Sequence, residues 1–133
     1  MSNWLPGDSD WLPKWQLITA SLALFNVAQN FTTTTLTKRV YSNTTQVTDL
    51  SARTFGVWTL LSAVLRFYCA YNVRNAVLYD VTIWSYVIAF AHFGSEIFVF
   101  KTAKLVGPAL SPVIVASTSL IWMLSQRSYY LGL

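Results

Sequence analysis

The chain has 133 residues, of which 54% are apolar and only 11% are charged, and its formal net charge at pH 7 is +4. A soluble domain is usually about one quarter charged, so these side chains are too few to solvate a globular surface, and a soluble helical bundle is disfavoured. The basic residues stand mainly at the ends of apolar runs, which excludes a basic nucleic-acid groove and indicates one compact unit in a membrane.

The first fifteen residues lack the features of a cleavable signal peptide. Asp8 and Asp10 are acidic where a signal peptide begins with basic residues, and prolines and tryptophans replace the apolar centre that it needs. No arginine precedes Arg39, which argues against a mitochondrial presequence. We therefore expect the first apolar run to act as an uncleaved anchor.

Four apolar runs are long enough to cross a bilayer as helices, which takes about 20 residues each. They extend over about 15–36, 54–73, 78–100 and 108–126. A polar loop, 37–53, separates the first two, whereas only a few residues join the second to the third, so those helices are antiparallel neighbours. Pro108 or Pro112 is expected to begin the fourth helix, because proline is tolerated in a first turn. The sequence predicts an all-α, integral membrane four-helix transmembrane bundle, with residues 1–133 as a single four-span domain.

Small and polar side chains recur at helical spacing within three of these runs. The stripes are Thr19, Asn26, Asn30 and Thr33 in the first run, Thr59, Ser62, Arg66 and Cys69 in the second, and Thr82, Ser85, Ala89, His92 and Glu96 in the third. Residues spaced three and four apart share one face of a helix, and in lipid such a face turns toward other helices. We therefore predict a bundle with a polar seam.

Two ion pairs between the second and third helices follow from this arrangement. An ionisable group at mid-bilayer costs at least about 2.5 kcal/mol, so each needs a partner. If the hairpin turns near residues 75 and 76, Arg66 lies level with Ser85 and its long side chain can reach Asp80. The same register brings Glu96 close to Arg53. We predict both pairs, Arg66 with Asp80 and Arg53 with Glu96, and expect Arg66→Leu to loosen the bundle.

His92 and Glu96 are the strongest candidates for chemistry, because residues four apart on a helix can bind a metal or relay a proton. A catalytic metal needs about three protein ligands, and the chain has one histidine and one cysteine, so a satisfied polar seam is favoured over a metal site. No dinucleotide-binding, P-loop or hydrolase motif is present either. We therefore expect no metal, no cofactor and no catalytic residues, and the chain is not predicted to be an enzyme.

Two motifs carry a resemblance to a known family. The first is L-S-A-R-T-F-G-V-W-T from Leu50 to Thr59, and the second is H-F-G-S-E from His92 to Glu96. Supporting matches are L-P-K-W at 12–15, T-K-R-V-Y at 37–41 and S-L-I-W-M at 119–123. Together they resemble the ergosterol biosynthetic protein 28 family, in particular its fungal members, over roughly residues 12–130.

The resemblance implies a function that composition does not reveal. Members of the family are non-catalytic proteins of the endoplasmic reticulum membrane that hold together the enzymes of sterol C-4 demethylation. The implied partners are a C-4 methyl sterol oxidase, a decarboxylating 3-hydroxysteroid dehydrogenase and a 3-ketosteroid reductase. The residues that match the family motifs are Arg53, Phe55, Gly56, Trp58, His92 and Glu96, and either packing within the hairpin or contact with partners would explain them. The longer basic carboxyl-terminal tail of some members is not matched here.

Two other functions remain open at this point. The polar seam could serve as the cleft of a sterol or lipid carrier, or Arg66, Asp80, His92 and Glu96 could line a proton or ion path, which His92→Ala would abolish. Small-xxx-small pairs such as Ser85 with Ala89 suit a homodimer, a partner helix or internal packing equally.

The distribution of basic residues favours one membrane orientation. Five of them, Lys38, Arg39, Arg53, Lys101 and Lys104, fall in or beside the two loops at one end, against Lys14, Arg74 and Arg127 at the other. This asymmetry weakly places those two loops in the cytosol. A glycan at the sequon that begins with Asn43 would reverse the assignment.

Overall fold

The structure is a computed structural model of the chain that describes residue 6 and residues 10–133. Within that part every regular element is helical: α1 (Trp11–Thr32), α2 (Thr35–Val40), α3 (Asp49–Tyr71), α4 (Ala76–Phe98), the short 3₁₀ helix η1 (Gly107–Ala109) and α5 (Leu110–Leu131). The all-α prediction is therefore confirmed. Most of the segment on which the signal-peptide prediction depends lies outside the described residues.

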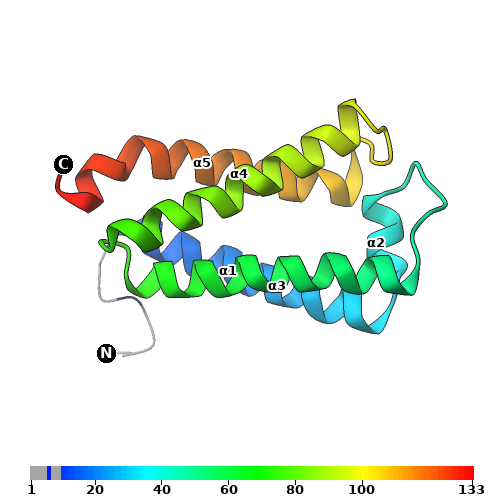
Figure 1. Cartoon of the computed structure of the whole chain (residues 1–133), viewed down its shortest axis with the longest axis horizontal. Coiled ribbons are helices and arrows are strands. Elements are labelled where there is room, and N and C mark those ends of the chain that lie inside the picture. The colour runs from blue at the N-terminus through cyan, green and yellow to red at the C-terminus, as the bar shows by residue number, and fades with distance from the viewer. Residues whose placement is uncertain (1–5, 7–9) are drawn as a thin grey trace.

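The four long helices form two close pairs. α1 packs against α3 along much of its length, and α4 packs against α5, whereas the contacts between α3 and α4 are fewer and those between α1 and α5 are sparse. All four run roughly along the long axis of the molecule (Figure 1). The start of α1, the α3–α4 turn and the end of α5 lie at one end, and α2, η1 and the two longer loops lie at the other (Figure 1).

The α1–α3 pair is close because its contact surface is made of small side chains. Ala20, Ala52 and Ala63 are fully buried there. A Cβ atom added at Gly56 would lie 2.8 Å from the ring of Phe31, closer than real Cβ contacts allow. Small residues let helix backbones approach in this way, which is typical of helix pairs in membranes. Gly56 is thus a packing residue of the α1–α3 contact.

The first helix and the loop after it differ from the sequence-based expectation. α1 ends at Thr32, because Thr33 adopts an extended conformation and its hydroxyl accepts a hydrogen bond from the Thr35 backbone at 3.2 Å. Threonine side chains offer the backbone such alternatives to a helical bond. α2 then occupies part of the expected loop 37–53. α3 begins at Asp49, ahead of the expected 54, because Thr48 and Ser51 form a reciprocal capping box.

The last helix begins as the prolines predict. Pro108 lies in the single 3₁₀ turn of η1, which leads directly into α5 at Leu110. Pro112 falls in the first turn of α5, where its missing N–H would have had no helical partner. α4 also has a capped start: the Asn75 side chain accepts a hydrogen bond from the Leu78 backbone N–H at 3.0 Å.

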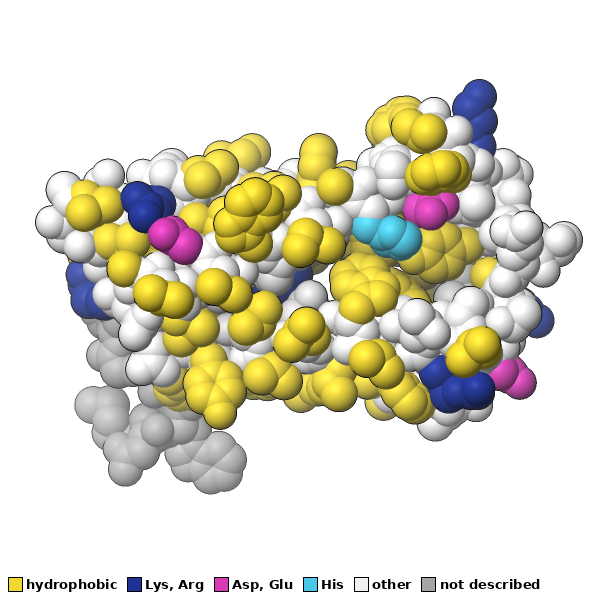
Figure 2. All heavy atoms as spheres, viewed as in Figure 1, with side chains coloured by type: hydrophobic (Ala, Val, Ile, Leu, Met, Phe, Trp, Pro, Cys, Tyr) yellow, Lys and Arg dark blue, Asp and Glu magenta, His cyan; other side chains and the backbone are white. Residues whose placement is uncertain are grey.

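Two helical segments of the described chain are long and apolar enough to cross a membrane, Ala76–Phe98 and Gly107–Leu131. Large apolar side chains are also exposed on α1 and α3, including Leu22 and Leu61. Figure 2 shows this apolar cover on the face that it displays, with charged side chains mainly toward the two ends.

Candidate functional site: a cleft between the helix pairs

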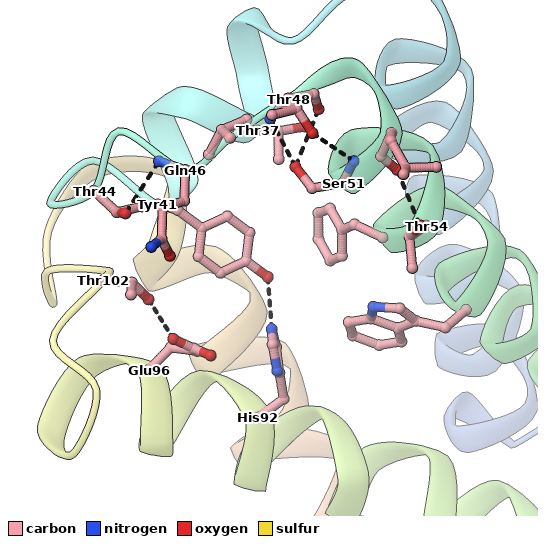
Figure 3. A pocket seen from close by; sticks show the side chains of 14 residues that line it. Thr37, Tyr41, Thr44, Gln46, Thr48, Ser51, Thr54, His92, Glu96 and Thr102 are labelled. Carbon is pink, nitrogen blue, oxygen red and sulfur yellow. Dashed lines mark hydrogen bonds between the residues drawn. The ribbon is translucent and has the colours of Figure 1, made fainter.

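A cavity of about 500 Å³ opens at the loop end of the molecule, between α3, α4 and the loops 41–48 and 99–106. Figure 3 shows Tyr41, His92, Glu96 and Thr102 around it, with Thr48, Ser51 and Thr54 at the start of α3 on the facing side. In Figure 2 the surface is hollowed beside the histidine, with apolar side chains at the floor. We call this the end cavity.

Tyr41 and His92 form the central polar contact of the end cavity. The Tyr41 hydroxyl and His92 Nε2 are hydrogen-bonded at 2.6 Å, and Phe55, Trp58 and Phe93 surround the two rings. Burial, reinforced by the nearby carboxylate of Glu96, raises the pKa of Tyr41 far above its ordinary value. The phenol therefore stays protonated, because a phenolate would be both poorly solvated and repelled by Glu96.

Glu96 holds the loop that follows α4. The Thr102 hydroxyl donates a hydrogen bond to its carboxylate. The backbone N–H groups of Thr102 and Ala103 donate to the Glu96 carbonyl at 2.9 and 3.2 Å. Asn43 joins the second loop to the first, since its side-chain amide donates to the Lys101 carbonyl at 2.5 Å and its backbone N–H donates to the Thr102 carbonyl at 3.0 Å. The two loops thus form one unit over the end cavity.

The predicted ion pair between Arg53 and Glu96 is wrong. Arg53 is exposed and lines a shallow cavity with Asp49, Asn30 and Thr33 on the α1 side of α3. Residues two positions apart on a helix are separated by about 200° of rotation. Because Phe55 faces α4, Arg53 faces away from it.

A second cavity of about 250 Å³ lies deeper between the two helix pairs, and we call it the inner cavity. Phe55 and Trp58 belong to the walls of both cavities. The other walls of the inner cavity come from α1, α2, α4, η1 and α5 and are mostly apolar: Leu22, Ala23, Leu36, Val40, Ala89, Phe93, Pro108, Pro112, Val115 and Ala116. Arg66 is the charged residue in its lining.

Arg66 is only 7% exposed and has two described partners. Its Nε donates a long hydrogen bond of 3.4 Å to the Ser85 hydroxyl, and its guanidinium carbon lies 4.0 Å from the centroid of the Tyr86 ring. The prediction that Arg66 lies level with Ser85 is confirmed, whereas the predicted ion pair of Arg66 with Asp80 is wrong.

Asp80 pairs with Arg127 of α5 instead. Arg127 Nε to Asp80 Oδ1 and Arg127 Nη2 to Asp80 Oδ2 are both 2.8 Å. The Tyr79 hydroxyl donates to the Met123 carbonyl at 2.5 Å, which sets the register of α4 on α5. Arg127 follows Met123 by one helical turn on the same face of α5, so its long side chain reaches Asp80, the residue after Tyr79. A pairing rule that compares only α3 with α4 therefore assigns the wrong partner.

The predicted polar seam is confirmed at the junction of α1, α4 and α5. The Tyr86 hydroxyl donates to Gln16 Oε1 at 2.6 Å and is hydrogen-bonded to the Thr19 hydroxyl at 2.8 Å. Trp15 Nε1 donates to the Ser119 hydroxyl at 2.8 Å. Thr82, Ser85 and Ala89 of the predicted α4 stripe are buried, with His92 and Glu96 partly buried. Polar contacts thus join the two pairs without filling the space between them.

The residues singled out from the sequence divide into four groups. Those that come together around the end cavity are Phe55, Trp58, His92 and Glu96. Arg66 lies at the inner cavity and Gly56 at the α1–α3 contact, while Arg53 and Asp80 lie outside both cavities. Consequently Arg66, Asp80, His92 and Glu96 do not line one continuous path. Among the described residues, no three His, Cys, Asp or Glu side chains gather as a metal site would require.

Sequence reasoning missed the aromatic hydroxyls that organise the cleft. The sequence singles out Tyr41 only as the last residue of the motif T-K-R-V-Y, with no role for its hydroxyl. Tyr86 carried no signal beyond its place in an apolar run. Thr102 and Ala103, in the loop after α4, bind Glu96 because the chain turns back beyond the helix. Helical periodicity does not reveal such a contact.

Known proteins of one family match this chain along most of its length. The family described as Erg28 like protein matches residues 12–121. The chain is similar to ergosterol biosynthetic protein 28 of Schizosaccharomyces pombe, with 46% identity over 120 residues that cover 90% of this chain and 88% of that protein. The protein of the same name in Saccharomyces cerevisiae is 43% identical over 124 residues, with 92% and 84% coverage. The mouse ergosterol biosynthetic protein 28 homolog is 42% identical over 120 residues, with 89% and 86% coverage. No solved structure matches the chain. The chain therefore belongs to the ergosterol biosynthetic protein 28 family.

Proposed function

We propose that this chain is a non-catalytic, four-span scaffold of the endoplasmic reticulum membrane that holds the enzymes of sterol C-4 demethylation together. Family membership implies a role in sterol biosynthesis, and the fungal relatives carry ergosterol biosynthesis in their names. The tethering role, the compartment and the partners belong to the proposal.

The observation that best supports the scaffold proposal is the apolar outward face of the bundle. Each of the four long helices exposes several large apolar side chains, more than a soluble monomer of this size tolerates as one continuous cover. Examples are Phe25 on α1, Leu61 on α3, Trp84 on α4 and Ile121 on α5, each more than 60% exposed. A protein that exposes large apolar side chains on all four long helices is suited to lie in lipid and to bind other membrane helices there.

Buried polar residues help to explain why α1 and α3 fall short of the hydropathy that marks Ala76–Phe98 and Gly107–Leu131 as candidate membrane spans. A hydropathy average counts every residue of a helix, including those that never meet lipid. In α1 the buried polar residues are Gln16, Thr19 and Asn30, and in α3 they are Ser62 and Arg66. Both helices have 22 or 23 residues, and at about 1.5 Å per residue either can span the hydrocarbon core. We therefore propose that all four long helices cross the membrane.

The proposed partners are a C-4 methyl sterol oxidase, a decarboxylating 3-hydroxysteroid dehydrogenase and a 3-ketosteroid reductase. Holding successive enzymes together raises the effective concentration of each around an intermediate that does not leave the membrane. The last residue of α4 and the loop after it, residues 98–106, offer one docking surface. Phe98, Val99 and Phe100 are each about two thirds exposed there, beside Lys101 and Lys104.

Site-specific crosslinking tests the proposal. A photoreactive amino acid replaces Phe25, Leu61, Trp84 or Ile121 in turn, and the crosslinked products are identified from intact membranes. We expect at least one face to crosslink to each of the three enzymes, while a probe at buried Ala63 crosslinks to none. The same enzymes are expected to co-purify in mild detergent, and loss of the chain is expected to accumulate C-4 methylated or carboxylated sterols. Normal sterols together with crosslinks to lipid alone would contradict the scaffold.

A second function, binding of a sterol or other lipid, is favoured by the inner cavity with its largely apolar lining. Direct binding of a sterol by the purified chain would support it. It is compatible with a scaffold, because a protein that gathers enzymes of lipid metabolism can also hold a lipid.

A further inference from the structure

Arg66 is a buried cation without an acidic partner among the described residues. Asp80 is paired with Arg127, Glu96 accepts from Thr102 at the other cavity, and Asp49 is exposed at the start of α3. The Tyr86 ring and the Ser85 hydroxyl carry no full negative charge. Removing an arginine from water without a counter-ion is costly, and such residues within membrane segments usually mark a functional site.

With α3 and α4 across the membrane, as proposed above, the guanidinium lies too deep to reach an ordinary lipid phosphate. Its partner Ser85 is nine residues after the start of α4 at Ala76, which is about 13 Å along the helix. Lipid phosphates lie outside the hydrocarbon core. The anion that suits Arg66 must therefore be carried on a molecule that dissolves in the apolar layer.

The inner cavity opens sideways toward the surroundings of the bundle. Leu22 of α1 and Ser111 of α5 belong to its wall, and both are exposed. Contacts between α1 and α5 are sparse, so the wall is interrupted on that side. A molecule can thus enter from lipid between these helices, and a chain longer than the cavity can extend back through the same opening.

We propose that the inner cavity binds a membrane-soluble carboxylate, whose apolar body lies between the helix pairs and whose carboxylate pairs with Arg66. Arginine matches this ligand because the guanidinium can donate two parallel hydrogen bonds to a carboxylate. The bound anion neutralises the charge that the protein leaves uncompensated. The site does not depend on the scaffold function, because crosslinking to enzymes and binding of a carboxylate are measured separately.

Matched pairs of ligands test the carboxylate directly. The purified full chain in detergent is titrated with radiolabelled oleic acid and with oleyl alcohol, and with cholesterol hemisuccinate and its methyl ester. We expect the acid of at least one pair to bind about tenfold or more tightly than its neutral partner, which is the effect of a hydrogen-bonded charge. A preference for oleic acid or for the steroid acid identifies the apolar body. Equal binding of acid and neutral partner in both pairs, or no binding at all, would overturn the proposal.

Variants place the ligand in the cavity. Arg66→Met is expected to lower the affinity for the acid to that for the neutral partner, and Arg66→Lys to restore part of the difference. Ser111→Trp narrows the side opening and is expected to weaken binding of the acid. Thr118→Trp, at an exposed position of α5 outside the cavity wall, is the matched control and keeps wild-type binding. Unchanged affinity in both Arg66→Met and Ser111→Trp would refute this location, and the ligand pairs still test the wild-type chain if Arg66→Met does not fold.

Discussion

Asp80 and Arg127 make a two-point ion pair, with both nitrogen–oxygen distances at 2.8 Å, that joins the first turns of α4 to the last turns of α5. The side chains of Arg127 and Asp80 are 38% and 42% exposed, so the pair lies at the edge of the bundle, where water screens it. It orients the α4–α5 pair and does not contact the cleft.

Breaking this pair is expected to destabilise the protein modestly. Asp80→Asn or Arg127→Met is expected to reduce the free energy of unfolding by about 1 kcal/mol or less, the range of exposed ion pairs. The double exchange Asp80→Arg with Arg127→Asp is expected to recover part of the loss. Thermal unfolding in detergent at low and high salt measures it. A loss that the exchange does not recover would show that packing, and not charge, is responsible.

Gly56→Ala is expected to destabilise the α1–α3 contact. The added methyl group would lie 2.8 Å from the Phe31 ring and 3.3 Å from Asn30 Cβ, so the ring must shift. Overpacking of this kind costs about 1–3 kcal/mol. Gly94→Ala is the matched control in α4, because nothing lies within 4 Å of its added Cβ. We expect a lower unfolding midpoint for Gly56→Ala and an equal or higher one for Gly94→Ala.

Tyr41 predicts a loss of stability at alkaline pH. Because the pKa of Tyr41 is raised in the folded protein, its contribution is complete below the pKa of an unfolded tyrosine, about 10, and decreases as the pH rises above it. Tyr41→Phe removes this term along with the hydrogen bond to His92. Unfolding midpoints across this pH range are therefore expected to fall less steeply for Tyr41→Phe than for the wild type. Parallel curves would indicate that Tyr41 is not a contributor.

Arg66→Met is expected to leave the unliganded protein at least as stable as the wild type. This reverses the expectation for Arg66→Leu, which rested on a pair with Asp80 that is not formed. The lost contact with the Tyr86 ring is worth up to about 2 kcal/mol, whereas desolvating an unpaired cation costs several. Thermal unfolding in ligand-free detergent decides the balance. A large drop in the midpoint would show that the Tyr86 contact outweighs the desolvation.

Glycosylation mapping tests the membrane orientation. If the loops after α1 and α4 face the cytosol, Asn43 is expected to carry no glycan, whereas an acceptor sequon appended after Leu133 is glycosylated. A mobility shift after endoglycosidase treatment reports each site. A glycan on Asn43 would place its loop in the lumen, and it would be attached to the side-chain nitrogen that donates a hydrogen bond to the Lys101 carbonyl.

The helices and their buried faces could be predicted from the sequence because both depend on local spacing. Apolar runs located the four long helices, and the three-and-four spacing of Thr82, Ser85 and Ala89 identified the buried face of α4. The end of α1 could not be predicted, because Thr33 is compatible with a helix until its hydroxyl binds the backbone of Thr35. Ion-pair partners failed for another reason. Asp80 has neighbours on two helices, and only the packing of Tyr79 on α5 decides between them.

The cavities could be anticipated only in outline. A polar seam implied inward-facing groups, but it did not reveal that α1 with α3 and α4 with α5 approach far more closely than the two pairs approach each other. That difference comes from side-chain size. Alanine and glycine line the contact within the first pair, whereas the bulky rings of Tyr86 and Phe93 lie between the pairs.

The two helix pairs are fastened to each other at both ends. The short α3–α4 turn joins them at one end, and at the other α2 contacts η1 while Asn43 binds the 99–106 loop. The width of the space between the two pairs therefore depends on these connections at its two ends. We therefore expect a protein that moves the loop end to change the affinity of the inner cavity for a ligand, and by thermodynamic reciprocity the ligand to change the affinity for that protein equally. Binding of a partner at the loop end and binding of a ligand in the inner cavity would then be coupled through the four helices.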